Sequence, residues 1–259
     1  MPIAHVSGLE INYDFSGPAG APVILFSNSL GSNFSMWDPQ VPGLSSRFRL
    51  LRCDTRGEGK TSVTSGPYTI EQLGRDVIAL MDHLGIDRAH FCGLSMGGMI
   101  GMWLALNAEQ RLHKVALCNT AAKIGTPETW NPRIETVTRN GMAAVSAAIT
   151  ERWFSPAFRA RTPDTVSAVR RMIESMPPAG YAACCAAVRD CDLRAELSRI
   201  RVPTLVISGT HDPATPPADG RFIVERILGA HFVEFNASHL SNIEAAAQFT
   251  SELIRFLAA

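Results

Sequence analysis

The stretch His90-Phe-Cys-Gly-Leu-Ser-Met-Gly-Gly-Met99 decides the fold of this chain. It contains the pattern Gly-x-Ser-x-Gly around Ser95, with an apolar run before it (89–92) and a run typical of a helix after it (98–106). This arrangement predicts a nucleophile elbow, a sharp strand-to-helix turn that holds a serine hydroxyl above the end of a sheet. The glycines are expected because a Cβ would clash in so tight a turn. The helix N-terminus would direct backbone N–H groups at negative charge forming beside the serine.

Two residues downstream strengthen this interpretation, because the pattern alone arises by chance in roughly one chain in ten of this length. α/β-Hydrolases supply a catalytic triad in the order serine, acid, histidine. The β-branched run 201–208 predicts a buried strand, and Asp212 follows it. The run 231–235 predicts the next strand, and His239 follows that one. The order and placement predict the triad Ser95, Asp212 and His239.

Each triad member also has an ordinary explanation. Ser95 fits an incidental serine in a glycine-rich turn. Asp212, before Pro213, fits a turn or helix-cap residue. His239 fits a histidine of a surface loop. His211 is a competing histidine, but it immediately precedes Asp212 and is expected to point away from it.

The rest of the chain predicts an α/β fold with one insertion. Apolar runs that predict strands lie at 3–6, 9–14, 22–26, 48–54, 89–92, 114–119, 202–208 and 231–235. Helical spacing at 70–84, 98–106 and 243–257 alternates with them, which predicts a mostly parallel, twisted sheet with helices on both faces, the α/β-hydrolase fold. Between 120 and 198 only helical segments are found, at 133–139, 142–153, 163–175 and 180–189. We therefore expect a core domain of residues 1–119 and 199–259 and a helical cap of residues 120–198.

The loop 27–32 follows the strand after which α/β-hydrolases place the second donor of their oxyanion hole. A tetrahedral oxyanion requires two N–H groups at about 3 Å. Met96, the residue after the serine, is predicted to supply one and Leu30 the other, with Ser29 beside the substrate. An ordinary glycine turn is the alternative for this loop. The loop 53–59 is interpreted as structural support for it.

Composition excludes several classes of function. Hydrophobic residues make up 46% of 259 residues, and 24 basic residues balance 24 acidic ones, so no overall field attracts nucleic acid or an anionic membrane. No signal peptide is recognisable at the N-terminus, and no apolar run approaches the ~18 residues that a membrane span needs. The six cysteines form no metal-binding spacing and are typical of reduced, cytoplasmic thiols. No metal or cofactor is expected, and the sequence leaves open whether the chain forms a homo-oligomer.

Several longer stretches resemble the 3-oxoadipate enol-lactonases, a family of the α/β-hydrolase superfamily. They are Phe26-Ser-Asn-Ser-Leu-Gly31, Met36-Trp-Asp-Pro-Gln40, Leu51-Arg-Cys-Asp-Thr-Arg-Gly57, Gly66-Pro-Tyr-Thr-Ile70, Cys92-Gly-Leu-Ser-Met-Gly-Gly98, Asn119-Thr-Ala-Ala-Lys-Ile-Gly125, Arg152-Trp-Phe154 and Ser238-His-Leu-Ser-Asn-Ile-Glu244. The chain departs from many relatives at Glu58, where they carry histidine, and near Thr61 and Lys60, where they carry serine.

The resemblance implies hydrolysis of 3-oxoadipate enol-lactone in bacterial catabolism of protocatechuate and catechol, with the triad as predicted and no cofactor. A general carboxylesterase or another small-lactone hydrolase would share the triad. So would a C–C bond hydrolase of meta-cleavage pathways, a perhydrolase-type haloperoxidase, or a non-catalytic binding protein of this fold.

The implied substrate is an anion, so the cap is expected to supply a cation. Arg133 is the first candidate because it stands near the start of the cap, with Trp130 as an apolar wall beside it. Arg152, next to Trp153, is the second.

Overall fold

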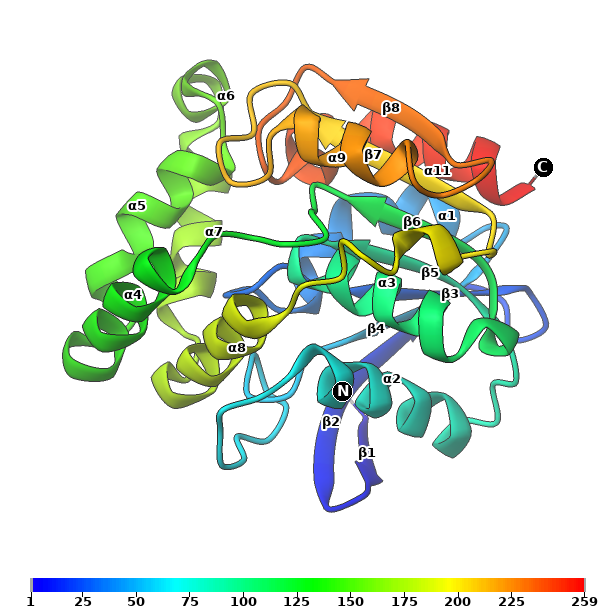
Figure 1. Ribbon diagram of the computed structural model, residues 1–259, viewed down its shortest axis with the longest axis horizontal. Coiled ribbons are helices and arrows are strands. Elements are labelled where there is room, and N and C mark those ends of the chain that lie inside the picture. The colour runs from blue at the N-terminus through cyan, green and yellow to red at the C-terminus, as the bar shows by residue number, and fades with distance from the viewer. Residues whose placement is uncertain (1, 259) are drawn as a thin grey trace.

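The computed structural model describes residues 2–258 (Figure 1). Its centre is a sheet in the order β1-β2-β4-β3-β5-β6-β7-β8. The strands are β1 (Ile3–Val6), β2 (Leu9–Ser16), β3 (Val23–Ser27), β4 (Arg49–Cys53), β5 (Ala89–Leu94), β6 (Leu112–Cys118), β7 (Thr204–Gly209) and β8 (His231–Phe235). The pairs β1–β2 and β2–β4 are antiparallel, and every other pair is parallel. The predicted mostly parallel sheet is therefore confirmed.

Burial explains why the central and edge strands have different patterns of apolar residues in the sequence. Every residue of β5 and β7 is buried, as expected for parallel strands covered on both faces. At the sheet edge, β1 alternates, with Ala4 and Val6 buried and their neighbours exposed. The central strands thus carry the elbow and the triad loops on a rigid, fully packed base.

Helices cover both faces of the sheet, as predicted. α2 (Ile70–His83), α3 (Met96–Asn107) and α9 (Pro217–Val224) lie in front in Figure 1, and α1 (Val41–Leu44) and α11 (Ala246–Ala258) lie behind. The short elements η1 (Phe34–Gln40), η2 (Glu109–Arg111), η3 (Leu197–Arg199) and α10 (Ser241–Glu244) complete this part. The C-terminal helix was expected to run unbroken from residue 243, but Ala245 has a φ of −119° and separates α10 from α11.

Five helices lie between β6 and β7, at the carboxyl ends of the strands (Figure 1, left). They are α4 (Pro127–Asn140), α5 (Ala143–Trp153), α6 (Pro156–Arg161), α7 (Pro163–Glu174) and α8 (Pro178–Asp190). α6 was not expected, and α4 begins six residues before the predicted start at Arg133. Four of the five begin with proline, whose fixed φ suits the first helical position.

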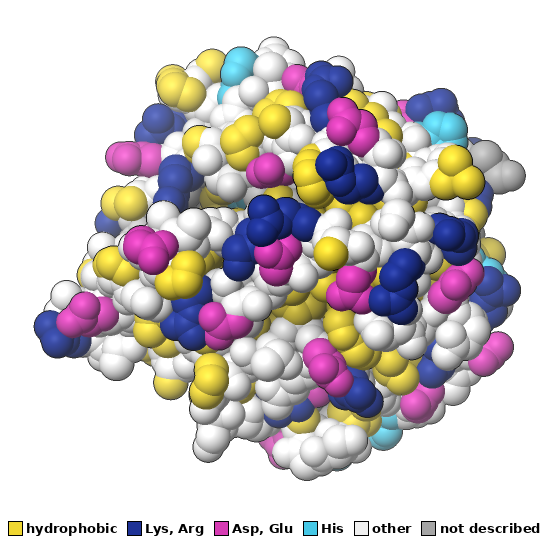
Figure 2. Space-filling model, in the orientation of Figure 1, with side chains coloured by type: hydrophobic (Ala, Val, Ile, Leu, Met, Phe, Trp, Pro, Cys, Tyr) yellow, Lys and Arg dark blue, Asp and Glu magenta, His cyan; other side chains and the backbone are white. Residues whose placement is uncertain are grey.

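The face of the molecule seen in Figure 2 shows no strong segregation of charge. Figure 2 shows basic and acidic side chains interspersed on the visible face, with small apolar areas between them. Within residues 2–258, no helix has the length and apolarity to cross a bilayer.

Candidate active site

The elbow places Ser95 between β5 and α3, with φ 59° and ψ −114°. Added Cβ atoms would lie 2.1 Å from the Gly97 carbonyl oxygen at Gly93, and 2.2 Å from the Ser27 carbonyl oxygen at Gly97. Only glycine fits these positions. The Ser95 N–H donates to the Cys118 carbonyl (2.9 Å), so β6 holds the elbow from the side.

The loops after β7 and β8 bring Asp212 and His239 together. Nδ1 of His239 lies 2.7 Å from Oδ2 of Asp212, and both side chains are buried. Oδ1 of Asp212 accepts the N–H groups of Ala214 (2.8 Å) and Thr215 (3.1 Å). With an acceptor at Nδ1, the imidazole keeps its proton there and leaves Nε2 free to accept another. His211 instead bonds Asn236 through Nε2 at 2.7 Å, so it does not compete for Asp212.

Asn119 and Thr215 also donate hydrogen bonds to the Asp212 carboxylate, a role that was not predicted. Oδ2 of Asp212 accepts from Asn119 Nδ2 (3.0 Å) and Thr215 Oγ1 (2.7 Å). Ser241 Oγ in turn donates to Asn119 Oδ1 at 2.5 Å. Burial by itself raises the pKa of Asp212, but the attraction of His239 and these hydrogen bonds outweigh it and lower the pKa below its usual value. Asp212 is thus stabilised as a carboxylate.

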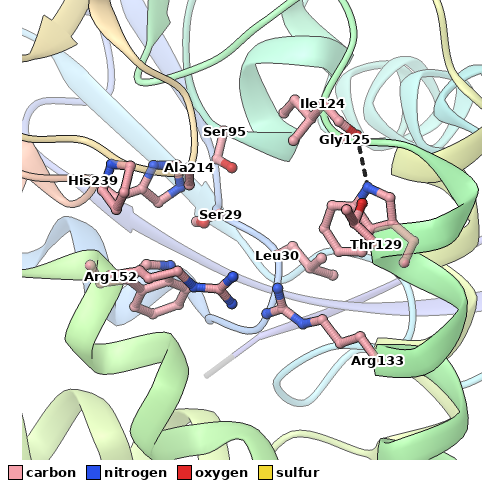
Figure 3. A pocket seen from close by; sticks show the side chains of 13 residues that line it. Ser29, Leu30, Ser95, Ile124, Gly125, Thr129, Arg133, Arg152, Ala214 and His239 are labelled. Carbon is pink, nitrogen blue, oxygen red and sulfur yellow. Dashed lines mark hydrogen bonds between the residues drawn. The ribbon is translucent and has the colours of Figure 1, made fainter.

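A cavity of about 210 Å³ opens over the serine (Figure 3). It is lined by Ser29, Leu30, Ser95, Ile124, Gly125, Thr129, Trp130, Arg133, Arg152, Trp153, Pro213, Ala214 and His239. This set includes the predicted substrate contacts Ser29, Leu30, Trp130, Arg133 and Trp153, but not the predicted oxyanion donor Met96. The indole of Trp130 is fixed by its Nε1–H, which donates to the Ile124 carbonyl (2.7 Å), and the ring of Trp153 stacks 6.4 Å from that of His239.

The two N–H groups predicted for the oxyanion hole come from two separate turns. Met96 is the first residue of α3, and Leu30 lies in a turn closed by the Ser32 N–H and the Ser29 carbonyl (3.2 Å). Within residues 2–258, neither the Leu30 nor the Met96 N–H donates to another group. The Gly97 N–H, by contrast, donates to the Asn28 carbonyl at 3.0 Å and ties the two turns together.

Two arginines face the cavity from different cap helices, and Figure 3 shows both guanidinium groups directed toward it. The Arg133 guanidinium carbon lies 5.3 Å from the Trp130 ring centroid and 5.4 Å from that of Tyr181. No carboxylate of the described chain forms an ion pair with Arg133 or Arg152. Burial and the charge of Arg133 lower the pKa of Arg152. The far side of the cavity is therefore cationic and unneutralised.

No metal-ligand cluster is present in residues 2–258: no three His, Cys, Asp or Glu side chains converge in the manner of a metal site.

Comparison with known proteins identifies the family to which the chain belongs. Residues 22–246 match the family model of the alpha/beta hydrolase fold, so the chain belongs to the α/β-hydrolase family. The 3-oxoadipate enol-lactonase 2 of Acinetobacter baylyi is 41% identical over 255 residues, which cover 96% of each chain. The crystal structure of the enol-lactonase from Burkholderia xenovorans LB400 matches with a TM-score of 0.98 and 49% identity over all of both chains.

A third match is a thermophilic esterase from Thermogutta terrifontis, with a TM-score of 0.92, 28% identity, and coverage of 99% of this chain and 97% of that one. Within the α/β-hydrolases, the chain groups with the 3-oxoadipate enol-lactonases and is a carboxylic ester hydrolase.

Proposed function

We propose that this protein hydrolyses 3-oxoadipate enol-lactone to 3-oxoadipate with Ser95, His239 and Asp212 as its catalytic triad. One observation carries the proposal: a single cavity has Ser95 and His239 on one side and two arginines without carboxylate partners on the other. Such a cavity suits a small ester that also bears a carboxylate. The likeness to named enol-lactonases supports the same substrate.

The proposed reaction uses the three residues in turn. Nε2 of His239 takes the hydroxyl proton of Ser95 while Oγ attacks the lactone carbonyl carbon. Asp212 stabilises the imidazolium that forms. The N–H groups of Leu30 and Met96 bind the oxyanion. The ring C–O bond then breaks, and the leaving enolate takes the proton held by the His239 imidazolium to give the enol, which rearranges to the ketone. An enolate leaves more readily than an alkoxide does, so little further help is needed. Water activated by His239 finally cleaves the acyl-enzyme.

The arginines account for recognition of the acetate arm of the lactone. A carboxylate enclosed by the cap is destabilised unless a cation pairs with it. Arg133 is our first candidate, since Trp130 and Tyr181 flank its guanidinium group and hold it in place. Arg152 adds positive charge from α5, next to Trp153.

The proposal includes a metabolic setting, the bacterial catabolism of protocatechuate and catechol. It also includes a cytoplasmic location. The support for that location is the set of six free cysteines, which is typical of proteins in a reducing compartment.

The decisive experiment compares substrates. Enzymatically generated enol-lactone, followed by loss of ultraviolet absorbance, is assayed beside p-nitrophenyl acetate and a meta-cleavage product, with Ser95→Ala as the control. We expect kcat/KM for the enol-lactone to exceed that for the neutral ester by several orders of magnitude. Equal kcat/KM values would identify a general carboxylesterase, and preference for the meta-cleavage product a C–C bond hydrolase.

A further inference from the structure

Glu58 is a buried carboxyl that the triad chemistry does not use. It lies in the loop after β4, and its side chain has no exposed surface. Oε1 accepts the N–H of Gly31 at 2.6 Å, across 27 residues of sequence. Oε2 is buried and has no hydrogen-bond partner within the described chain. Within residues 2–258, no cationic side chain pairs with this carboxyl, and its only specific polar contact is with the loop that carries Leu30.

That contact fixes one peptide of the oxyanion turn. The turn runs from Ser29 to Ser32, and Gly31 has a φ of +85°, as the third residue of a type II turn requires. Ser32 holds the Ser29 carbonyl through its N–H (3.2 Å) and its hydroxyl (2.6 Å). The Leu30–Gly31 peptide has no such bond within the turn. Its orientation depends on the acceptor that Glu58 supplies.

Packing leaves the Gly31 peptide little alternative. An added Cβ on Gly31 would lie 2.9 Å from the ring of Tyr181, which comes from α8 of the cap. Gly180 of the same helix approaches the Glu58 loop so closely that its Cβ would lie 1.8 Å from the Gly57 carbonyl oxygen. Gly31 is itself buried, so without Glu58 its N–H would be buried and would lose its acceptor.

We infer that Glu58 is a positioning residue for catalysis: by anchoring the Leu30–Gly31 peptide, it fixes the turn that also contains the adjoining Ser29–Leu30 peptide, whose N–H is directed at the oxyanion. This inference rests on the proposed role of Leu30 as an oxyanion donor. Burial, reinforced by the negative charge of Asp54, raises the pKa of Glu58 well above its usual range, which favours the uncharged carboxyl. Glutamine therefore mimics the resident form, whereas an ionised group here would repel the oxyanion.

The test compares Glu58→Leu with Glu58→Gln. Leucine fills the space but offers no acceptor, whereas glutamine keeps one. With p-nitrophenyl acetate as substrate, we expect Glu58→Leu to lower kcat by about 10- to 100-fold, somewhat less than outright removal of an oxyanion donor. KM should change less than twofold, and Glu58→Gln should keep kcat within about threefold of the parent. If Glu58→Leu does not fold, Glu58→Asp takes its place, since a side chain one methylene shorter loses the 2.6 Å contact.

Thr61→Val is the matched control. Thr61 Oγ1 accepts the Asn12 N–H (3.0 Å) and donates to the Asp54 carbonyl (2.9 Å), so it anchors the same loop without touching the oxyanion turn. We expect it to lower Tm and leave kcat unchanged. An unchanged kcat in Glu58→Leu, an equal loss of kcat in Thr61→Val, or failure of Glu58→Gln to retain kcat would each overturn the inference. Activity in Ser95→Ala would instead overturn the proposed mechanism. Because the assays of Glu58→Leu and Ser95→Ala use the neutral ester, their outcomes do not depend on which substrate is the natural one.

Discussion

At the scale of single residues, the backbone of Ser95 is the most constrained feature of the site. A non-glycine residue at φ 59° and ψ −114° lies outside the regions that side chains normally allow, at a cost of order 1–3 kcal/mol. The neighbouring bonds sustain it: the Cys118 carbonyl accepts its N–H, and Thr120 Oγ1 donates to its carbonyl at 2.7 Å. The strain is consistent with a hydroxyl held in one direction over the cavity.

We predict that Ser95→Ala abolishes turnover and leaves the fold intact, because it removes the nucleophile and creates no unpaired polar group. His239→Ala should lower kcat by a similar factor, on the order of 10⁴ or more, and the double variant little further, since triad residues act as a unit. Steady-state kinetics on the enol-lactone measure this, and circular dichroism checks the fold. More than a few per cent activity in Ser95→Ala would exclude the acyl-enzyme, and a harmless Asp212→Asn would exclude Asp212 as the acid.

The triad residues could be predicted from the sequence because each lies in the loop that follows an apolar strand. The residues that support the acid could not. Asn119 reaches Asp212 across 93 residues only because β6 and β7 are neighbours in the sheet, and strand order is not encoded in any local pattern. For Glu58 the sequence indicated a supporting loop, but not the single N–H that its side chain accepts.

At the scale of elements, the cap helices determine which substrates the cavity accepts. The sequence predicted four of these five helices, and it started α4 and α8 after the prolines with which they begin. In the structure Pro127, Pro156, Pro163 and Pro178 begin helices, and Pro132 lies inside α4. Thr126 and Thr129 form a capping box that starts α4 early enough to include it. Proline thus marks the first turns of these helices rather than the gaps between them.

For α4, we predict that Arg133→Ala raises KM for the enol-lactone by about 10- to 150-fold, the equivalent of a charge-assisted pair of roughly 1.5–3 kcal/mol. The neutral p-nitrophenyl acetate should be hardly affected, because it carries no carboxylate. Steady-state kinetics of Arg133→Ala on both substrates measure these two KM values. Equal loss on both would mean that Arg133 supports the fold of the cap, and no loss on either would remove it from the binding site.

For α8, we predict that Gly180→Ala destabilises the protein although alanine favours helices by about 1 kcal/mol. The new Cβ would meet backbone, the Gly57 carbonyl oxygen at 1.8 Å, and such overpacking costs about 1–3 kcal/mol. Urea denaturation should show a lower midpoint. Gly20→Ala is the control: an added Cβ there meets nothing within 4 Å, so a gain of about 0.4–1 kcal/mol is expected. A midpoint that rises equally in both variants would show that α8 shifts freely.

At the scale of the whole molecule, the sheet core sets how stability responds to pH. β5 carries the elbow at one end and His90 near the other, where the imidazole is 7% exposed and Nδ1 has no partner within the described residues. The ring of His113 on β6 lies 5.3 Å away. The pairing of the two histidines was not predicted, because it depends on the β5–β6 register, which sequence patterns do not specify.

Burial, with smaller contributions from His113 and Lys114, lowers the pKa of His90 from 6.5 to about 4. Between these values the unfolded chain binds a proton that the folded chain does not, so the free energy of unfolding must fall as the pH falls. The full loss below pH 4 is about 3 kcal/mol at 1.36 kcal/mol per pKa unit. Urea denaturation between pH 7.5 and 4 should therefore show that the free energy of unfolding decreases less in His90→Asn than in the parent. This comparison of slopes holds even if the two proteins differ in stability at pH 7.5. His83→Asn, at an exposed position of α2, should follow the parent curve. Parallel curves for His90→Asn and the parent would show that His90 is protonated in the folded protein and that this end of the sheet admits water.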